Sequence, residues 1–250
     1  MTSEAWDLAH AAAETAGVSL RPLTSLEDAD AILHVMIATW GEHQLLPREE
    51  IMALAESGNV PWGADSGGDT IGYVLGWAGI DPEDGLHVHS HMLAALPGRR
   101  HRGVGYALKL AQRAACLDQG IQLIRWTFDP MISRNAWFNL GKLGATADRF
   151  RRNFYGEMAD SLNAGERSDR LVVRWDLDRP PGPREAPPSH ESITVPREYE
   201  ALKGSDPDSA YLERDRVADA LEASFARGNI VVAFEGGSAT YALAMPEAAR

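Results

Sequence analysis

A basic turn with two glycines, placed between an apolar strand and an amphipathic helix, constrains the fold of this chain most strongly. It reads Leu-Pro-Gly-Arg-Arg-His-Arg-Gly-Val-Gly over residues 96–105. Gly103 and Gly105 leave the backbone bare where a ligand would approach. The first N–H groups of the helix lack internal partners at its positive dipole end, which suits phosphate oxygens. Arg99, Arg100 and Arg102 add charge-assisted bonds, so the turn predicts a phosphate-binding loop.

The spacing of this loop excludes two common nucleotide-binding motifs. Arg100-x-x-Gly103-x-Gly105 is too short for a Walker loop, and it differs from the G-x-G-x-x-G pattern of dinucleotide sites. An ordinary strand–helix turn with solvated arginines remains the alternative. The clustered arginines favour the phosphate loop, because the chain as a whole is acidic, with 24 basic and 36 acidic residues and a formal net charge of −12.

The acidic balance also argues against a general affinity for nucleic acid or anionic membranes. No apolar run approaches the roughly 18 residues that span a bilayer. Residues 1–16 carry acidic groups and no basic start, so they do not resemble a signal peptide. The single Cys116 cannot form an internal disulfide and is expected to be a buried core thiol. We therefore expect a cytoplasmic protein without nucleic-acid or membrane partners.

The hydrophobic pattern predicts a mixed α/β fold. Helix 25–40 starts at Ser25, which has capping-box spacing to Asp28. In helix 103–118, an apolar stripe opposes a predicted wet face formed by Lys109, Gln112 and Arg113. Further helices are expected at 47–58 and 133–143, and strands at 20–22, 60–64, 70–78, 86–95, 121–128, 150–155 and 171–177.

The composition changes at residue 179, where five prolines within ten residues predict a stiff linker. Beyond the linker, a helix at 207–226 and an apolar strand at 230–234 are expected, which is marginal for an independent fold. We therefore predict a main domain at 1–178, a Pro-rich linker at 179–192, and a C-terminal α/β extension at 193–250. The extension is expected to dock on the main domain or on a partner subunit, for instance in a homodimer.

With its flanking strand and helix, the Arg-x-x-Gly-x-Gly loop resembles the acyl-CoA pyrophosphate loop of the GNAT superfamily of N-acyltransferases. Six further stretches resemble a bacterial subgroup of predicted acetyltransferases: His-Ser-His-Met at 89–92, Trp-Thr-Phe-Asp-Pro at 126–130, Ser-Arg-Asn-Ala at 133–136, Lys-Leu-Gly-Ala at 142–145, Tyr-Gly-Glu-Met at 155–158 and Ser-Asp-Arg-Leu at 168–171. The resemblance implies a mixed, mostly antiparallel central sheet with helices on both faces.

The resemblance also implies acetyl-CoA or another acyl-CoA as cofactor. Strand residues 92–94 would pair with pantetheine, and the loop would hold the pyrophosphate. Ser133 and Asn135 would hydrogen-bond the cofactor or cap the helix that they open. The residues expected at the cofactor are Met92, Leu93, Ala94, Arg99, Arg100, His101, Arg102, Gly103, Val104, Gly105, Tyr106, Ser133 and Asn135.

Acyl transfer requires an amine that loses its proton, and the sequence places three histidines where a base would be needed. Period two puts His87, His89 and His91 on one face of a strand, with Met92 on the other. His89 and His91 lie nearest the expected thioester and are the candidate bases. They could instead be hydrogen-bonded residues that only shape the pocket. Zinc ligation is a third interpretation, but no fourth ligand is evident nearby, so no metal is expected.

The family's general acid has no counterpart here. Many GNAT enzymes carry a Tyr seven residues into the helix that ends in Gly-Phe, and the matching positions hold Leu140 and Ala145. Tyr155 on the following strand could replace it as a catalytic residue, or the thiolate could leave unassisted because thiols are acidic enough.

The loop after helix 25–40 usually forms part of the acceptor site in GNAT enzymes, so Trp40, Glu42 and His43 are candidate substrate contacts. The resulting hypothesis is an N-acyltransferase that moves acetyl or another short acyl group to the amine of a small metabolite such as an amino acid. The alternatives are a CoA-binding sensor or scaffold without turnover, motivated by Leu140, and a phosphate-binding enzyme unrelated to CoA.

Overall fold

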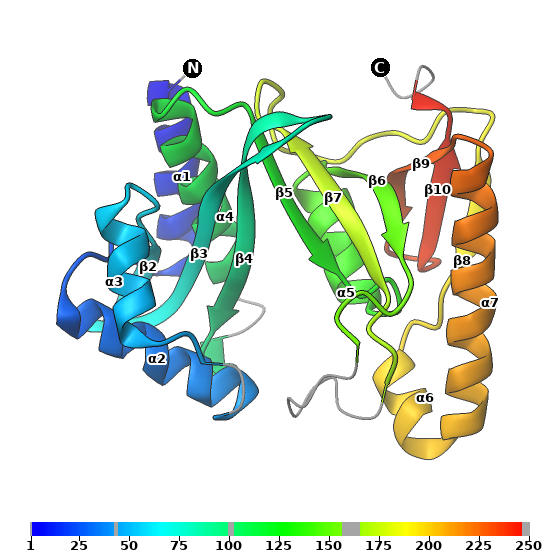
Figure 1. Ribbon diagram of the computed structural model, residues 1–250, viewed down its shortest axis with the longest axis horizontal. Coiled ribbons are helices and arrows are strands. Elements are labelled where there is room, and N and C mark those ends of the chain that lie inside the picture. The colour runs from blue at the N-terminus through cyan, green and yellow to red at the C-terminus, as the bar shows by residue number, and fades with distance from the viewer. Residues whose placement is uncertain (1, 43–44, 100–102, 157–165, 247–250) are drawn as a thin grey trace. The chain divides into compact units, whose positions relative to one another are not determined.

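The computed structural model describes residues 2–42, 45–99, 103–156 and 166–246 (Figure 1). The chain forms two compact units that meet in sequence between Ile124 and Arg125. Each unit has its own layered arrangement of sheet and helices.

The first unit is built on four antiparallel strands in the order β1-β2-β3-β4. The hairpin of β3 and β4 contains the two longest strands of this unit. Both strands are rich in aliphatic and aromatic residues, and Gly85 turns between them with a φ of 67°. The strands span Ser19–Pro22 (β1), Trp62–Ser66 (β2), Asp69–Asp81 (β3) and Gly85–Ala95 (β4).

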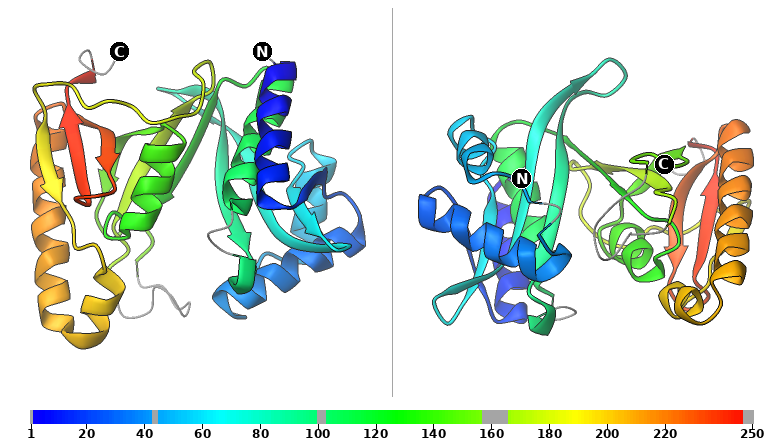
Figure 2. Two further views of the ribbon diagram at one scale, coloured as in Figure 1. Left: turned by 180° about the vertical axis from the view of Figure 1, so that it is seen from behind. Right: turned by 60° about the horizontal axis from the view of Figure 1, so that its bottom comes forward.

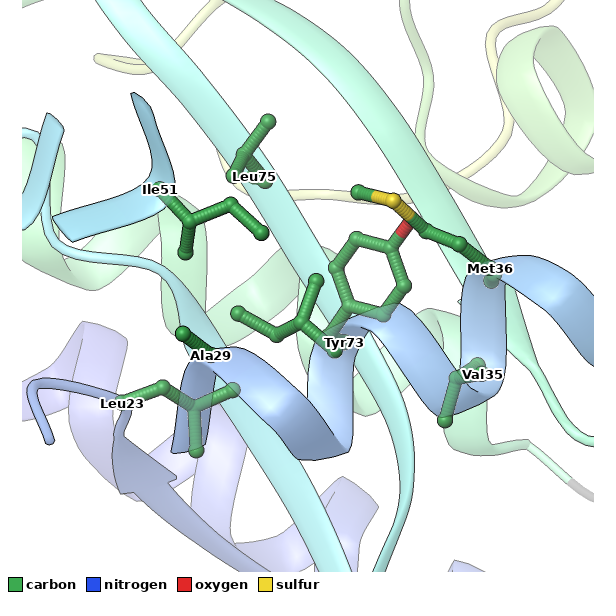
Figure 3. Close-up of a cluster of buried hydrophobic side chains, with 9 residues drawn as sticks. Leu23, Ala29, Val35, Met36, Ile51, Tyr73 and Leu75 are labelled. Carbon is green, nitrogen blue, oxygen red and sulfur yellow. The ribbon is translucent and has the colours of Figure 1, made fainter. Parts of the chain in front are cut away.

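Helices α2 (Leu26–Trp40) and α3 (Arg48–Glu56) cover one face of this sheet. The predicted capping box is confirmed: the Ser25 side chain accepts from the Asp28 amide, and the Asp28 carboxylate accepts from the Ser25 amide at 2.9 Å. The core between these two helices and the sheet contains the fully buried Tyr73 and Leu75 of β3 (Figure 3). Around these two lie Leu23, Ala29, Ile32, Val35, Met36, Ile51 and Ala94.

Helix α4 (Val104–Asp118) covers the other face, where Val104 and Leu108 pack on strands β2 and β3. Helix α1 (Thr2–Ala16), which was not predicted from the sequence, runs alongside α4 (Figures 1 and 2). Its buried side is narrow, with alanines at every fourth position, which gives little hydrophobic signal.

The prediction that Lys109, Gln112 and Arg113 form a solvent-exposed face of α4 is wrong. Lys109, Gln112 and Arg113 are 2%, 7% and 8% exposed. The prediction assumed a helix with one side in water, whereas the sheet and α1 both pack against α4. This difference bears directly on the functional site.

Strand β5 (Leu123–Phe128) leads into the second unit, whose strands follow the order β5-β7-β6-β9-β10-β8. The pairings of β6 with β7 and β9, and of β10 with β9 and β8, are antiparallel. The remaining strands span Thr146–Arg151 (β6), Arg170–Asp176 (β7), Glu191–Thr194 (β8), Ile230–Glu235 (β9) and Thr240–Ala244 (β10). The strand predicted at 150–155 is wrong in position, because a bulge near Ala147 in β6 breaks the alternation that marks a strand.

The helix predicted at 133–143 is a short α-helix, α5 (Ser133–Ala136), continued by the π-helix η2 (Trp137–Lys142). After the proline-rich segment come α6 (Tyr199–Ser205) and the long α7 (Pro207–Ala226), whose predicted bounds are confirmed. Helix α7 packs against β8 and β6.

A buried ion cluster fastens α7 within the second unit. Arg214 is 2% exposed and donates to both carboxylate oxygens of Asp129, at 3.2 and 2.9 Å, and to Glu166 at 3.0 Å. Its Nε also donates to the Tyr199 hydroxyl at 3.1 Å. Because every charge in the cluster has a partner, its burial is tolerated.

The predicted mixed, mostly antiparallel architecture with helices on both faces of the sheet is confirmed. No helix in the described ranges is long and apolar enough to cross a bilayer.

Candidate functional site

A β-bulge in β4 sets the geometry of the candidate site. Leu75 pairs with Met92, but the next residue of β3, Gly76, pairs with Ser90, so His91 is an extra residue in β4. The bulge corrects the predicted faces: Met92 does not lie opposite the histidines. Its sulfur accepts from the Tyr73 hydroxyl at 3.6 Å, on the α2 side of the sheet. An extra residue shifts the alternation by one, which brings side chains on both sides of the bulge to one face.

On that face, the two candidate bases form an aromatic group with Trp77 of β3. The Trp77 ring lies 5.3 Å from the His89 ring and 4.7 Å from the His91 ring, centre to centre, and the two imidazoles are 5.9 Å apart. Trp77 also packs against the core under α2. Trp77 was not among the predicted site residues, although its alternation with Tyr73 and Leu75 could have indicated the shared face.

His87 differs from the other two histidines. It is 9% exposed, its ring packs on Gly79, and its Nδ1 lies 3.1 Å from the Gly85 carbonyl oxygen. This is a structural role at the hairpin, so the preference for His89 and His91 over His87 agrees with the geometry.

The surroundings keep both candidate bases neutral near pH 7. Burial lowers the pKa of His89 to about 4, with smaller contributions from the charges of His91, His87 and Lys109. Burial also lowers the pKa of His91. A neutral imidazole can accept a proton, and a base works best when its pKa is close to the working pH. His91, which is the more exposed of the two, is therefore the stronger candidate.

The start of α4 has the backbone geometry expected of an anion-binding loop. Gly103 precedes the helix with a φ of 89°, which is left-handed, and no side chain caps the helix there. Helix geometry leaves the amides of Val104, Gly105 and Tyr106 without an intrahelical acceptor. These features fit a diphosphate, as the loop motif predicts. Arg99 ends a short 3-10 turn, η1 (Pro97–Arg99), and the predicted contacts Arg100, His101 and Arg102 lie outside the described residues.

The strand residues predicted at the cofactor are divided between the two faces of β4. Met92 and Ala94 face the α2 core, whereas Leu93 packs toward α4. All three pair with β3 on one side, opposite Leu75, Tyr73 and Val74 respectively. Their pairing with pantetheine stays a prediction.

The predicted contacts on α5 are used differently. The Ser133 hydroxyl donates to the Arg197 carbonyl oxygen at 2.9 Å, and Asn135 is exposed. Ile132 occupies the N-cap and no side-chain bond caps the helix, so the capping interpretation is wrong for both residues. The C-terminal segment thus engages Ser133 directly.

The positions considered for a general acid all lie in the second unit. Leu140 and Ala145 are fully buried core residues, so neither position offers a proton. Tyr155 does not lie on a strand as predicted but in the turn after β6, where it is 44% exposed. Its hydroxyl lies 3.1 Å from the Thr127 hydroxyl, and the Arg170 guanidinium sits 5.4 Å from its ring centre.

The acceptor loop is described only in part. Trp40 packs against the core of the first unit, so it has a structural role there. Glu42 is exposed, and His43 lies outside the described residues. Among the described residues, no group of three His, Cys, Asp or Glu side chains converges as a metal site would require.

Comparison with known proteins shows similarity in fold only. No family model matches the sequence, and no curated protein matches it. Among solved structures, the ribosomal-protein-S18-alanine N-acetyltransferase from Escherichia coli matches with a TM-score of 0.51 and 13% identity, over 64% of this chain and 94% of that one. Naa20 from Chaetomium thermophilum, in complex with a bisubstrate analogue, matches with a TM-score of 0.51 and 19% identity, over 65% of this chain and 88% of that one.

A third match is Naa50 from Arabidopsis thaliana in complex with the bisubstrate analogue CoA-Ac-MVNAL, with a TM-score of 0.50 and 17% identity, over 63% of this chain and 97% of that one. The fold is therefore that of the GNAT acetyltransferases, as the loop motif predicts. About a third of the chain lies outside each match.

Proposed function

We propose that this protein is an acyl-CoA-dependent N-acyltransferase that moves acetyl or another short acyl group to the amine of a small metabolite, such as an amino acid. The observation that carries the proposal is the β4 bulge, which brings two neutral imidazoles of β4 to one face of the sheet beside the Trp77 indole of β3. Strand β4 ends at the phosphate-binding loop. The GNAT fold supports it, because two of the similar structures hold bisubstrate analogues. We place the protein in the cytoplasm.

In this mechanism, the acyl-CoA thioester supplies the activated acyl group. The free amides of Val104, Gly105 and Tyr106, with the loop arginines, would hold the diphosphate. His91, or His89 through a water molecule, would accept the proton that the amine must lose before it attacks. The CoA thiolate would leave unassisted, or with the proton of the exposed Tyr155 hydroxyl.

A CoA-binding sensor without turnover is the second candidate. Two observations favour it: the buried Leu140 where a phenol would serve as acid, and the Ser133 hydroxyl that is already bonded to the C-terminal segment. A CoA-release assay with acetyl-CoA and succinyl-CoA over a panel of amines separates the two. Release above the uncatalysed rate supports the enzyme, whereas CoA binding without release by any amine supports the sensor.

Two variants test the assignment within the site. Gly103→Val should weaken CoA binding strongly, because a β-branched residue is strained at a φ of 89° and blocks the backbone from the diphosphate. Gly120→Val is the matched control, since Gly120 has a similar φ of 75° at the other end of α4. Equal CoA binding by both variants would contradict the loop assignment.

His91→Ala should lower turnover about 10²-fold with little change in CoA affinity if His91 is the base. His34→Ala removes an exposed histidine of α2 and serves as the control. An unchanged rate in His91→Ala would remove His91 from the mechanism.

A further inference from the structure

Behind the two candidate bases, on the α4 side of the sheet, lies a buried lysine. Lys109 is 2% exposed, and its ammonium donates to the Ser90 hydroxyl at 2.9 Å and to the Gln112 side-chain oxygen at 2.9 Å. Ser90 and Gln112 are themselves 6% and 7% exposed. We call Ser90, Lys109 and Gln112 the α4 brace.

The brace joins the strand at the bulge itself. Ser90 stands between His89 and His91 in sequence and pairs with Gly76, the first residue of β3 past the register shift. A Cβ on Gly76 would lie 2.5 Å from the His89 carbonyl oxygen and 3.2 Å from the Gln112 amide nitrogen. Glycine at this position therefore allows β3, β4 and α4 to approach one another closely.

The bond between Lys109 and Ser90 can determine the direction in which the His89 and His91 side chains point. Side chains alternate along a strand, so anchoring Ser90 on the α4 side directs its neighbours His89 and His91 away from α4. A bulge is a local register choice, and a strand without an anchor can shift its extra residue along the chain. A bond from α4 to the residue beside the bulge fixes that choice.

Burying the Lys109 ammonium in the α4 brace costs free energy of desolvation. Burial lowers the pKa of Lys109 to about 7, which shows that the charged form is disfavoured where it lies. Well-packed apolar side chains often replace buried ionic groups without loss of stability. A role in specifying the site, rather than in stabilising the fold, accounts for a lysine at this position.

We propose that Lys109 is a positioning residue for the acyl transfer: through Ser90 it fixes the β4 bulge and holds His89 and His91 on the α2 side of the sheet, beside Trp77. This inference rests on the proposed function. It adds a buried residue that would not touch acyl-CoA or the amine.

The kinetic test uses Ser90→Ala and Lys109→Met, which break the brace from either side. Both should lower kcat for CoA release about tenfold or more, because small misplacements of a catalytic group cost that much, and should leave KM for acyl-CoA within about twofold. Ser90→Thr keeps the hydroxyl and should retain most of kcat. Ile71→Ala truncates a buried side chain at the same sheet–α4 interface but outside the brace, so it should cost stability and not kcat.

A second readout does not depend on turnover. In protein labelled at histidine, the ring signals of His89 and His91, assigned with His89→Gln and His91→Gln, should shift in Ser90→Ala and Lys109→Met and stay in place in Ile71→Ala. If the wild type releases no CoA with any amine, the proposed function fails, and the ring signals alone decide whether the brace orients the histidines. If Lys109→Met does not fold, Ser90→Ala decides.

The inference is overturned if Ser90→Ala keeps both the wild-type kcat and the wild-type ring signals. It is also overturned if the ring signals move while kcat does not, because the histidine positions would then not matter for the rate. A fall in kcat with unmoved ring signals would assign Lys109 another role and overturn the positioning mechanism as well.

Discussion

Replacing Lys109 by methionine should change how stability depends on pH. The folded-state pKa of Lys109 is about 7, against 10.5 for a lysine in water, and the cause is desolvation by burial. Between these two values the unfolded chain binds more protons than the folded one, so the free energy of unfolding rises with pH. This gain in the free energy of unfolding is lost as the pH falls from 10.5 through about 7. The full difference in pKa corresponds to about 5 kcal/mol, and the part gained between pH 7 and pH 9 to about 2 kcal/mol.

Methionine has a similar length and no titrating group, so Lys109→Met lacks this contribution. Two titratable groups that interact with Lys109 are His89 on β4 and Cys116 on its own helix; both are uncharged between pH 7 and pH 9, and both are present in the variant. The wild type should therefore gain about 2 kcal/mol relative to Lys109→Met between pH 7 and pH 9.

Urea denaturation followed by tryptophan fluorescence at pH 7, 8 and 9 measures this difference, since the chain has seven tryptophans. A difference between the two proteins that stays constant over this range would refute the reasoning. It would mean that the Lys109 ammonium keeps the proton affinity of a lysine in water, and hence that it is not desolvated in the folded protein.

Two further changes should alter stability through named contacts. Gly76→Ala should destabilise the fold by about 2 kcal/mol or more, because its Cβ would lie 2.5 Å from the His89 carbonyl oxygen, and a wild-type urea midpoint would contradict the register of the bulge. Arg214→Met leaves Asp129 and Glu166 without their buried partner and should cost about 3–5 kcal/mol, whereas Arg216→Met, on the same helix but exposed, should cost under about 1 kcal/mol. Equal shifts in melting temperature for the two arginine variants would contradict the importance of the buried cluster.

Local signals in the sequence predicted local structure well. The capping box of α2, the proline at the start of α7 and the glycine before α4 act within a single turn of chain, so residue types alone indicate them. The anion-binding geometry of the loop belongs to this group, because it depends on the backbone next to Gly103.

Features that depend on contacts distant in sequence were not predictable. Lysine is a residue type expected on a solvent-exposed helix face. Only the packing of α1 and the sheet around α4 shows that Lys109 is buried. The bulge at His91 is similarly hidden, because Gly76 on the neighbouring strand makes room for it. An alternating pattern assumes a regular strand and therefore placed Met92 on the wrong face.

The tail strand β9 pairs with β6, and Trp137 of η2 lies against Gly236 in the turn that follows β9. A chain shortened at the proline-rich segment would thus expose the amide and carbonyl groups along the β6 edge, together with the part of the Trp137 indole that packs on Gly236. Unpaired strand edges of this kind recruit other chains, so the shortened protein would tend to self-associate. We therefore expect residues 191–246 to keep the sheet from pairing with other chains.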